Sequence, residues 1–225
     1  MTSTAESTGS SAAPGKEALV SAAERLIAER GFHGVAAREV VKESGHKNNS
    51  AINYHFGSWQ GLLDGIWQRH SVPISRERAE RLADIGDNST LPELVAVYIG
   101  PLVNEVARAT PSYWARYNEQ WLASTPLDVT AAGWTGTLSR VHTPELPELY
   151  QLGALLDQIA AQLDWLPADD RRRRVSLMSR FVIVALAAVE RDAARETHDP
   201  ARTDPRWPDV TAELVTLALA LLRAG

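Results

Sequence analysis

The sequence contains no cysteine among its 225 residues. Disulfide bonds and thiolate chemistry are therefore excluded, and the composition fits a reducing cytoplasm, where we expect the protein to be located. No apolar run approaches the roughly 20 residues that a membrane-spanning helix needs, so no membrane partner is expected. The first residues, MTSTAESTGSSAAPG, have neither a basic start nor an apolar stretch, and we expect no signal peptide there.

Runs of alternating β-branched residues are also lacking, and no internal repeat is present. Apolar residues instead recur at helical spacing along most of the chain, which predicts an all-α fold. We expect three regions: a disordered tail over residues 1–14, an N-terminal three-helix domain over 15–70, and a helical C-terminal domain over 71–225.

Catalytic and metal-binding patterns are missing as well. The sequence has no Ser/His/Asp spacing, no metal-ligand set and no phosphate-binding loop. Four histidines (His33, His46, His55 and His70) lie on separate predicted elements without paired spacing on one helix. We therefore expect the protein to be no enzyme and to bind neither a metal ion nor a cofactor.

Positive charge is scarce, since the formal net charge is −5. The acidity is concentrated outside the N-terminal domain, because residues 15–70 carry seven Lys or Arg against six Asp or Glu, and residues 71–225 carry sixteen against twenty-one. A surplus of one positive charge is a weak electrostatic footprint for a nucleic-acid binder. If the N-terminal domain binds DNA, modest affinity per subunit and a need for two subunits follow.

The stretch from Ser44 to Leu63 has the clearest local pattern. Gly45 is typical of a helix end, and a polar run follows it. A short helix is predicted over about 49–55, and Ser58 is a suitable N-cap for the next helix, which begins at Trp59.

This short helix has one apolar and one polar face. Ile52 and Phe56 are four residues apart and share the face that must be buried. The outer face is rich in Asn, Ser, Tyr and Lys, which suits a DNA major groove: Asn can form two hydrogen bonds to adenine, and the other side chains can reach phosphates.

The block GFHGVAAREVVKESGHKNNSAINYHFGSWQGLL resembles the helix-turn-helix of the TetR family of transcriptional regulators. The matching residues are Gly31-Phe32, Val40, Gly45, Tyr54-His55-Phe56-Gly57-Ser58 and Leu62-Leu63. With the preceding helix, the resemblance covers about a fifth of the chain. Alternatively, the aromatic residues of the motif only form the core of another kind of helical domain.

The block departs from the family pattern at four places. The segment from Gly45 to Phe56 is one residue longer than usual, and Ala36 stands where Ser or Thr commonly caps the second helix. His46 replaces a small apolar residue, and Trp59 replaces a Lys that contacts phosphate. These departures affect the register of the turn and one phosphate contact.

The resemblance implies a sequence-specific DNA-binding regulator, most often a homodimeric repressor that a small ligand releases from a near-palindromic operator. Residues expected at the DNA are Arg38, Lys47, Asn48, Asn49, Ser50, Asn53, Tyr54 and His55. For Arg38 an ordinary solvated side chain is the equal alternative.

The C-terminal region is expected to bind the ligand and to form the dimer. Aromatic residues share a face at spacings of three and four in the segment PSYWARYNEQWLAS, which predicts either part of the core or the wall of a mostly apolar pocket. The residues expected at a ligand are Tyr98, Trp114, Tyr117, Trp121, Met178 and Phe181.

Two apolar helices are predicted at the end of the chain, over 168–196 and from Pro208 onward. In the TetR family the last two helices of each subunit pair into a four-helix dimer bundle, and this pattern is compatible with such pairing. The main alternative function is a TetR-like ligand sensor or interaction module without specific DNA binding, which His46, Trp59 and the scarce positive charge favour.

Overall fold

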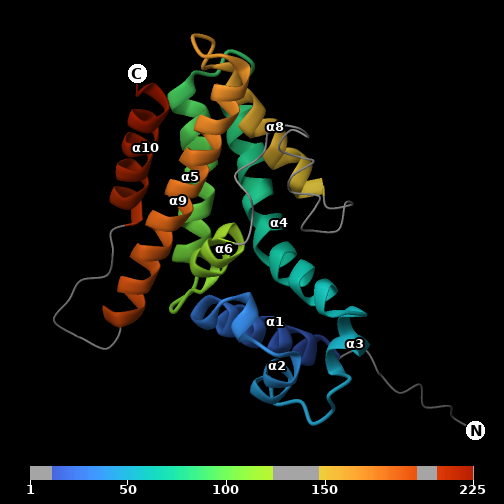
Figure 1. Ribbon diagram of the computed structural model, residues 1–225. Helices are drawn as coiled ribbons and strands as arrows, with labels where there is room; N and C mark the ends of the chain where they lie inside the picture. Colours follow the sequence, from blue (N-terminus) through green and yellow to red (C-terminus); the bar gives the residue numbers. More distant parts are fainter. Residues whose placement is uncertain (1–11, 124–146, 197–206, 225) are drawn as a thin grey trace, which may run out of the picture. The chain divides into compact units, whose positions relative to one another are not determined.

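The computed structural model describes residues 12–123, 147–196 and 207–224, and these residues form helices and the turns between them (Figure 1). The chain divides into two compact units, Met1–Gln68 and Arg69–Gly225. No strand occurs in the described ranges, so the expected all-α fold is confirmed.

The first unit contains three helices and a short 3-10 turn, followed by the start of a long helix. These elements are α1 (Ala12–Arg30), η1 (Phe32–Gly34), α2 (Ala37–Glu43), α3 (Ala51–Phe56) and α4 (Trp59–Ile85). Their core consists of aliphatic side chains at helical spacing, including Leu19, Ile27, Val40 and Leu62, none of which is accessible to solvent.

The expected tail is shorter than the sequence suggested. Residues 1–11 lie outside the described residues, but α1 begins at Ala12, so residues 12–14 are helical rather than part of a disordered tail. The physical reason is local: alanine has the highest helix propensity, and a proline in the first turn lacks only an N–H that would have no helical partner anyway.

A proline inside a helix predicts a kink or a break at Pro73, but α4 runs through it without a break. Proline removes one backbone hydrogen bond from a helix. Here Ser71 and Ile74 on either side of it are buried, and their packing keeps the helix continuous.

In the described residues, the second unit contains the C-terminal part of α4 and five further helices. These are α5 (Leu91–Ala107), α6 (Trp114–Ala123), α8 (Pro147–Ala161), α9 (Ala168–Glu196) and α10 (Trp207–Arg223). Twelve of the 17 residues of α5 are buried, so this helix is the centre of the unit, as its nearly all-round apolar sequence predicts.

Helix α5 begins at a capping box. The backbone N–H and the hydroxyl of Thr90 both donate to the Glu93 carboxylate, at 2.8 and 2.7 Å. Thr90 as the cap, Pro92 in the first turn and Glu93 as the third helical residue together predict a helix start, and α5 begins there. These bonds lower the pKa of Glu93.

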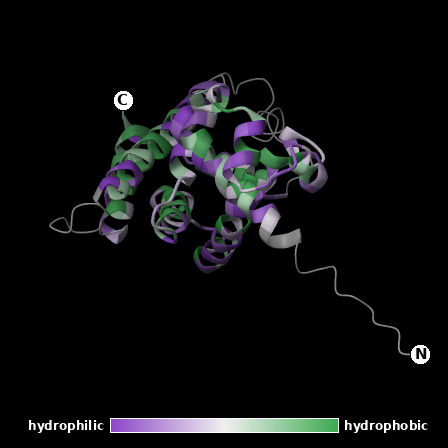
Figure 2. Cartoon of the chain, turned by 90° about the horizontal axis from the view of Figure 1, so that it is seen from below, coloured by the Kyte–Doolittle hydropathy of each residue, from purple (hydrophilic) through white to green (hydrophobic). Residues whose placement is uncertain are grey.

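Helices α9 and α10 lie beside α5, and α10 forms the C-terminal edge of the unit (Figure 1). Helix α10 carries both hydrophobic and hydrophilic bands (Figure 2). Its buried side chains are Leu214, Ala218 and Leu222, at spacings of four, so only one of its faces packs into the unit.

A buried carboxylate from α9 fixes the start of α6. Glu190 is 2% exposed, and its two oxygens accept hydrogen bonds from the Ser112 hydroxyl (2.7 Å) and the backbone N–H groups of Ala115 and Arg116 (3.0 Å each). The side chain of Arg116 donates a further bond through Nε at 3.0 Å. A carboxylate at a helix N-terminus satisfies otherwise unpaired N–H groups and is favoured by the helix dipole.

Helix α9 also contacts the middle and the end of α6. Arg191 forms an ion pair with Glu119, and Arg180 donates to the carbonyl oxygen of Leu122 at 2.7 Å. Side chains from α9 thus contact both ends of α6. Glu190 places a negative charge at its N-terminus, and Arg180 places a positive charge at its C-terminus.

No helix in the described residues is long and apolar enough to cross a membrane.

Replacing Glu190 by Gln should lower the free energy of unfolding by about 2–4 kcal/mol, because the neutral amide weakens four hydrogen bonds in a buried site. Urea denaturation would measure the loss. Asp192→Asn is the matched control, since Asp192 lies on the same helix in an exposed ion pair with Arg195 and should change stability by less than about 0.5 kcal/mol. Equal losses in the two variants would contradict the role assigned to Glu190.

Candidate nucleic-acid interface and ligand site

The end of α2 forms a Schellman motif, which sets the direction of the following turn. Gly45 has a φ of 77°, the left-handed conformation that glycine adopts without strain. The N–H of His46 donates to the carbonyl of Val41, and that of Gly45 to the carbonyl of Lys42, both at 3.1 Å. These are the two bonds that define the motif, so the predicted helix end at Gly45 is confirmed.

Asn48 shapes the turn between α2 and α3. Its side-chain oxygen accepts a hydrogen bond from the N–H of Ser50 at 2.9 Å, and its carbonyl accepts one from the N–H of Ala51 at 3.0 Å. Such a bond from an Asn side chain two residues back stabilises a turn. The sequence analysis assigned Asn48 only to DNA contact and missed this role.

Helix α3 ends at Gly57, whose φ is 74°, and the Ser58 hydroxyl accepts a bond from the N–H of Gly61 at 3.0 Å. The predicted cap of α4 is thereby confirmed. Gly61 itself permits a very close approach: a Cβ at this position would lie 2.1 Å from the carbonyl oxygen of Phe56. The absence of a side chain at residue 61 thus lets α4 start directly against the end of α3.

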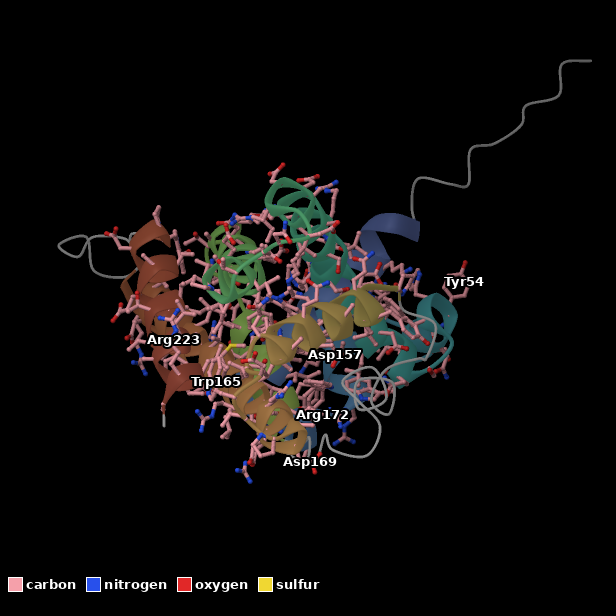
Figure 3. The ribbon with its side chains drawn as sticks, turned by 90° about the horizontal axis from the view of Figure 1, so that it is seen from above. Tyr54, Asp157, Trp165, Asp169, Arg172 and Arg223 are labelled. Carbon is pink, nitrogen blue, oxygen red and sulfur yellow. The ribbon has the colours of Figure 1, made fainter. Side chains whose placement is uncertain are left out.

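The polar face of α3 and of the preceding turn is open to solvent. Tyr54 is 80% exposed and its ring projects outward (Figure 3). Ala51 and Ile52 are buried on the opposite face, as the spacing of Ile52 and Phe56 predicts, while Phe56 is half-buried. The other exposed members of the predicted DNA-contact set are Arg38, Lys47, Asn48, Asn49, Ser50 and Asn53.

His55 stands apart from that exposed set. Its ring is half-buried and lies edge-on to the ring of His46, with 5.8 Å between centroids. A Cβ on Gly15 of α1 would lie 3.1 Å from Nε2 of His46 and 3.7 Å from Nε2 of His55, so both rings approach α1 where it lacks a side chain. His46, which replaces a small apolar residue of the family pattern, is thus accommodated by Gly15.

Ion pairs with α1 neutralise the acidic residues of α2. Glu39 pairs with Arg30 at 3.4 Å, and Glu43 pairs with Arg25. In the described part of the chain no acid forms an ion pair with Arg38, Lys42 or Lys47, all of which are exposed. The surface near the turn is therefore more positive than the surplus of one charge over residues 15–70 implies.

A hollow of about 620 Å³ lies on this positive surface. Its walls include Arg38 and Lys42 of α2 and Asn49 of the turn, together with Glu39, Val41, Gly45 and His46. The structure thus brings two members of the predicted set, Arg38 and Asn49, to one place and adds Lys42, which the sequence analysis missed. The sequence signal for Lys42 was its position four residues after Arg38, which places both cations on one face of α2.

In the second unit, aromatic side chains of α6 stack against α4. The ring of Trp114 lies 4.4 Å from that of His70, at an interplanar angle of 18°, and 5.8 Å from that of Tyr117, at 15°. His70 Nδ1 is 2.8 Å from a carboxylate oxygen of Glu105 on α5. The aromatic spacing in α6 thus produces a buried stack that continues onto α4.

Tyr98 of α5 contacts another residue of α4. The guanidinium of Arg78 lies 5.1 Å from the centre of the Tyr98 ring and donates to the Tyr98 carbonyl at 3.0 Å. Burial raises the pKa of the Tyr98 hydroxyl. It lowers the pKa of Arg78 to about 10, so the guanidinium keeps its charge at neutral pH.

With this geometry in view, the comparisons with known proteins identify the first unit. Residues 19–66 match the sequence profile described as bacterial regulatory proteins of the tetR family. The chain has the helix-turn-helix domain of the TetR family. The resemblance inferred from the motif is therefore confirmed, and the family comprises regulators rather than enzymes.

Solved structures of transcriptional regulators share the fold of almost the whole chain. The fatty acid degradation regulator FadR of Bacillus halodurans has 13% identity and a TM-score of 0.52, with 97% of this chain and 98% of that chain covered. FadR of Bacillus subtilis, solved in complex with stearoyl-CoA, has 15% identity and a TM-score of 0.52, with 93% and 98% covered. A TetR-like regulator of Rhodococcus sp. RHA1 has 14% identity and a TM-score of 0.51, with 94% and 97% covered. No curated protein sequence matches this chain.

The six residues predicted at the ligand divide into two groups. Five are buried: Tyr98, Trp114, Tyr117, Trp121 and Met178. Phe181 is half-buried, and it lies four residues after the exposed Leu177 and three before the exposed Val184. The six residues remain predicted ligand contacts.

Sequence reasoning missed His70 and Arg78 on α4. The signal for Arg78 was its spacing from Ser71 and Ile74, since positions 71, 74 and 78 share one face of a helix and all three are buried. Among the described residues, no group of three or more His, Asp or Glu side chains is placed to hold a metal ion.

Replacing Gly61 by Ala should destabilise the TetR-family domain by about 1–3 kcal/mol, because the added methyl group overlaps the Phe56 carbonyl and must push α3 away from α4. Chemical denaturation of the full chain would measure the effect. Gly100→Ala in α5 is the matched control: its Cβ would meet only the flexible end of Arg81, at 2.8 Å, and the substitution raises helix propensity. A Gly61→Ala variant as stable as Gly100→Ala would refute the close contact.

Proposed function

We propose that this protein is a homodimeric transcriptional repressor that binds a near-palindromic DNA operator and is released by a small, mostly apolar ligand. The observation that carries the proposal is the TetR-family helix-turn-helix, with an exposed polar α3 face between two glycine-ended helices. The family relationship favours a cytoplasmic location, where the operator DNA lies.

DNA contact in this proposal combines two kinds of interaction. Arg38, Lys42 and Lys47 supply charge for phosphates, which fixes the position of the domain but carries no sequence information. Asn49 and Asn53 are the candidates for reading bases, because an amide can donate and accept at one adenine edge. Tyr54 and Ser50 complete the surface as hydroxyl donors to the backbone.

A dimer is supported by an apolar stripe on α9. Leu177, Phe181, Val184 and Ala188 follow each other at spacings of four, three and four, and each is exposed or half-buried. Leu217 on the neighbouring α10 is exposed as well. A second subunit that packs its own α9 and α10 here would bury these side chains, and its two-fold symmetry would match a near-palindrome.

Release by a ligand follows from differential binding. A ligand that binds better to the conformation with low DNA affinity shifts the population toward that conformation. The aromatic side chains of α6 and Tyr98 of α5 are the proposed contacts, and the stearoyl-CoA complex of the FadR of B. subtilis is a precedent for a ligand with a long apolar part. Helix α4 crosses the boundary between Gln68 and Arg69, so it joins the two units covalently.

Selection of binding sites from a pool of random duplex DNA tests the proposal, followed by a salt titration on the enriched sequence. An enriched near-palindrome whose affinity falls steeply with salt is the expected result. A folded, dimeric protein that enriches no sequence would instead support a ligand sensor without specific DNA binding.

On the enriched operator, Asn53→Ala should weaken binding by about 1–3 kcal/mol per half-site while leaving binding to unrelated DNA nearly unchanged, because a base contact is lost and phosphate contacts remain. Fluorescence anisotropy at fixed salt would measure both affinities. Asn88→Ala, an exposed asparagine after α4, is the control that should change neither affinity. Equal losses on operator and unrelated DNA would contradict base reading by Asn53.

Replacing Val184 by Glu should raise the dimer dissociation constant by about a hundredfold or more, because it introduces a charge at the centre of the proposed apolar interface. Sedimentation velocity over a concentration series would measure this. Val72→Glu is the matched control, since Val72 is 49% exposed on α4 and Val184 is 47% exposed on α9. Unchanged dimerisation of Val184→Glu would place the interface elsewhere.

A further inference from the structure

Arg78 is a buried cation in the second unit. Its relative exposure is 6%. Among the described residues it forms one hydrogen bond, from Nη2 to the Tyr98 carbonyl at 3.0 Å. The Nε–H is buried and has no acceptor. The Nε–H of the guanidinium is therefore unsatisfied.

No carboxylate forms an ion pair with Arg78 in the part of the chain that the structure describes, and Glu77 favours its charge only through a weaker electrostatic interaction. The adjacent Glu77 instead accepts from Arg81 at 2.8 Å and from Asn104 at 2.7 Å, and it lies 3.8 Å from Arg108. The two buried glutamates of the unit are each paired elsewhere: Glu105 with His70 and Arg108, and Glu190 with Arg116.

A buried charge without an ion-pair partner is energetically unfavourable, because its hydration is lost and no carboxylate contacts it directly. Tyr98 offsets part of this cost through its carbonyl and the face of its ring. Neither contact carries a full negative charge. An anion at the unsatisfied Nε–H would supply what the protein lacks.

The local chemistry limits the anion to a narrow class. A single guanidinium matches a single negative charge, and its fork of N–H groups matches the two oxygens of a carboxylate. Ser71, two turns earlier on the same face of α4, has a buried hydroxyl without a partner, and the buried Ile74 lies between them. Seven residues span roughly 10 Å along a helix, so a ligand that reached both Ser71 and Arg78 would be elongated, with an apolar body beside Ile74.

We propose that Arg78 anchors the carboxylate of a small organic monoanion whose apolar part lies along this face of α4. The proposal rests on the ligand-responsive function above and deepens it, because it names the chemical class of the ligand and the residue that selects it. Binding occurs through a bidentate pair of charge-assisted hydrogen bonds, and no covalent step is involved.

The test compares octanoate with octanamide, which has the same chain and no charge, on the full-length protein. Binding is followed by the melting temperature and by tryptophan fluorescence, neither of which requires DNA. Octanoate should stabilise the wild-type protein, and octanamide should bind about tenfold to a hundredfold more weakly. Equal binding of the two compounds, or no stabilisation by octanoate, would overturn the proposal.

Arg78→Met should remove the preference for octanoate over octanamide while keeping a side chain of similar length. Arg76→Met is the matched control, because Arg76 is an exposed arginine two residues away on the same helix and should retain the wild-type preference. If Arg78→Met does not fold, Arg78→Lys replaces it: this variant keeps the charge, loses the bidentate fork and should bind octanoate about tenfold more weakly. A variant at residue 78 with wild-type octanoate affinity would overturn the proposal.

Operator binding in the presence of octanoate is measured separately. If octanoate binds through Arg78 but DNA affinity does not change, the carboxylate site stands and release by this ligand class fails. If DNA binding is specific but octanoate does not bind, the regulator stands and the carboxylate site is wrong.

Discussion

The second unit depends on one buried carboxylate. Glu190 on α9 accepts four hydrogen bonds from Ser112, Ala115 and Arg116, and so decides where α6 begins. With Arg180 at the other end, α6 can neither slide nor rotate without breaking charged hydrogen bonds. This fixed orientation of α6 also determines where its aromatic side chains lie, and it places Trp114 against His70 of α4. A constraint set by α9 therefore reaches α4, whose first residues belong to the TetR-family domain.

The first unit solves a different problem, which is to present positive charge from a nearly neutral domain. Arg25 and Arg30 of α1 pair with the two acids of α2, while the cations of α2 and of the turn remain at the surface. Such exposed pairs contribute little to stability. Their consequence is the positive electrostatic potential near the turn, where the proposed function places the DNA phosphates.

Arg78 differs from the other buried charged residues described in the second unit, which have partners of opposite charge. Glu105 and Glu190 each have a cationic partner and hydrogen-bond donors, as buried carboxylates generally require. Arg78 has a carbonyl and an aromatic ring but no anion among the described residues. Two buried carboxylates thus have ion-pair partners, whereas Arg78, next to the predicted ligand contact Tyr98, has none among the described residues. This difference is consistent with the proposed site, which a ligand completes.

The sequence by itself determined the local features: the all-α class, the bounds of α9 from Ala168 to Glu196, the helix end at Gly45 and the cap at Ser58. These depend on residues within a few positions of each other, so propensity, spacing and capping suffice to predict them. The sequence did not predict that α4 continues through Pro73, because burial on both sides of the proline outweighs its effect. It also did not predict the start of α1 at Ala12, within the expected tail, because local helix propensity extends the helix. Only the tertiary structure decided the long-range partners, Glu190 for α6 and Tyr98 for Arg78. Residues far apart in sequence choose among many possible acceptors, and which acceptor is within reach depends on how the helices pack.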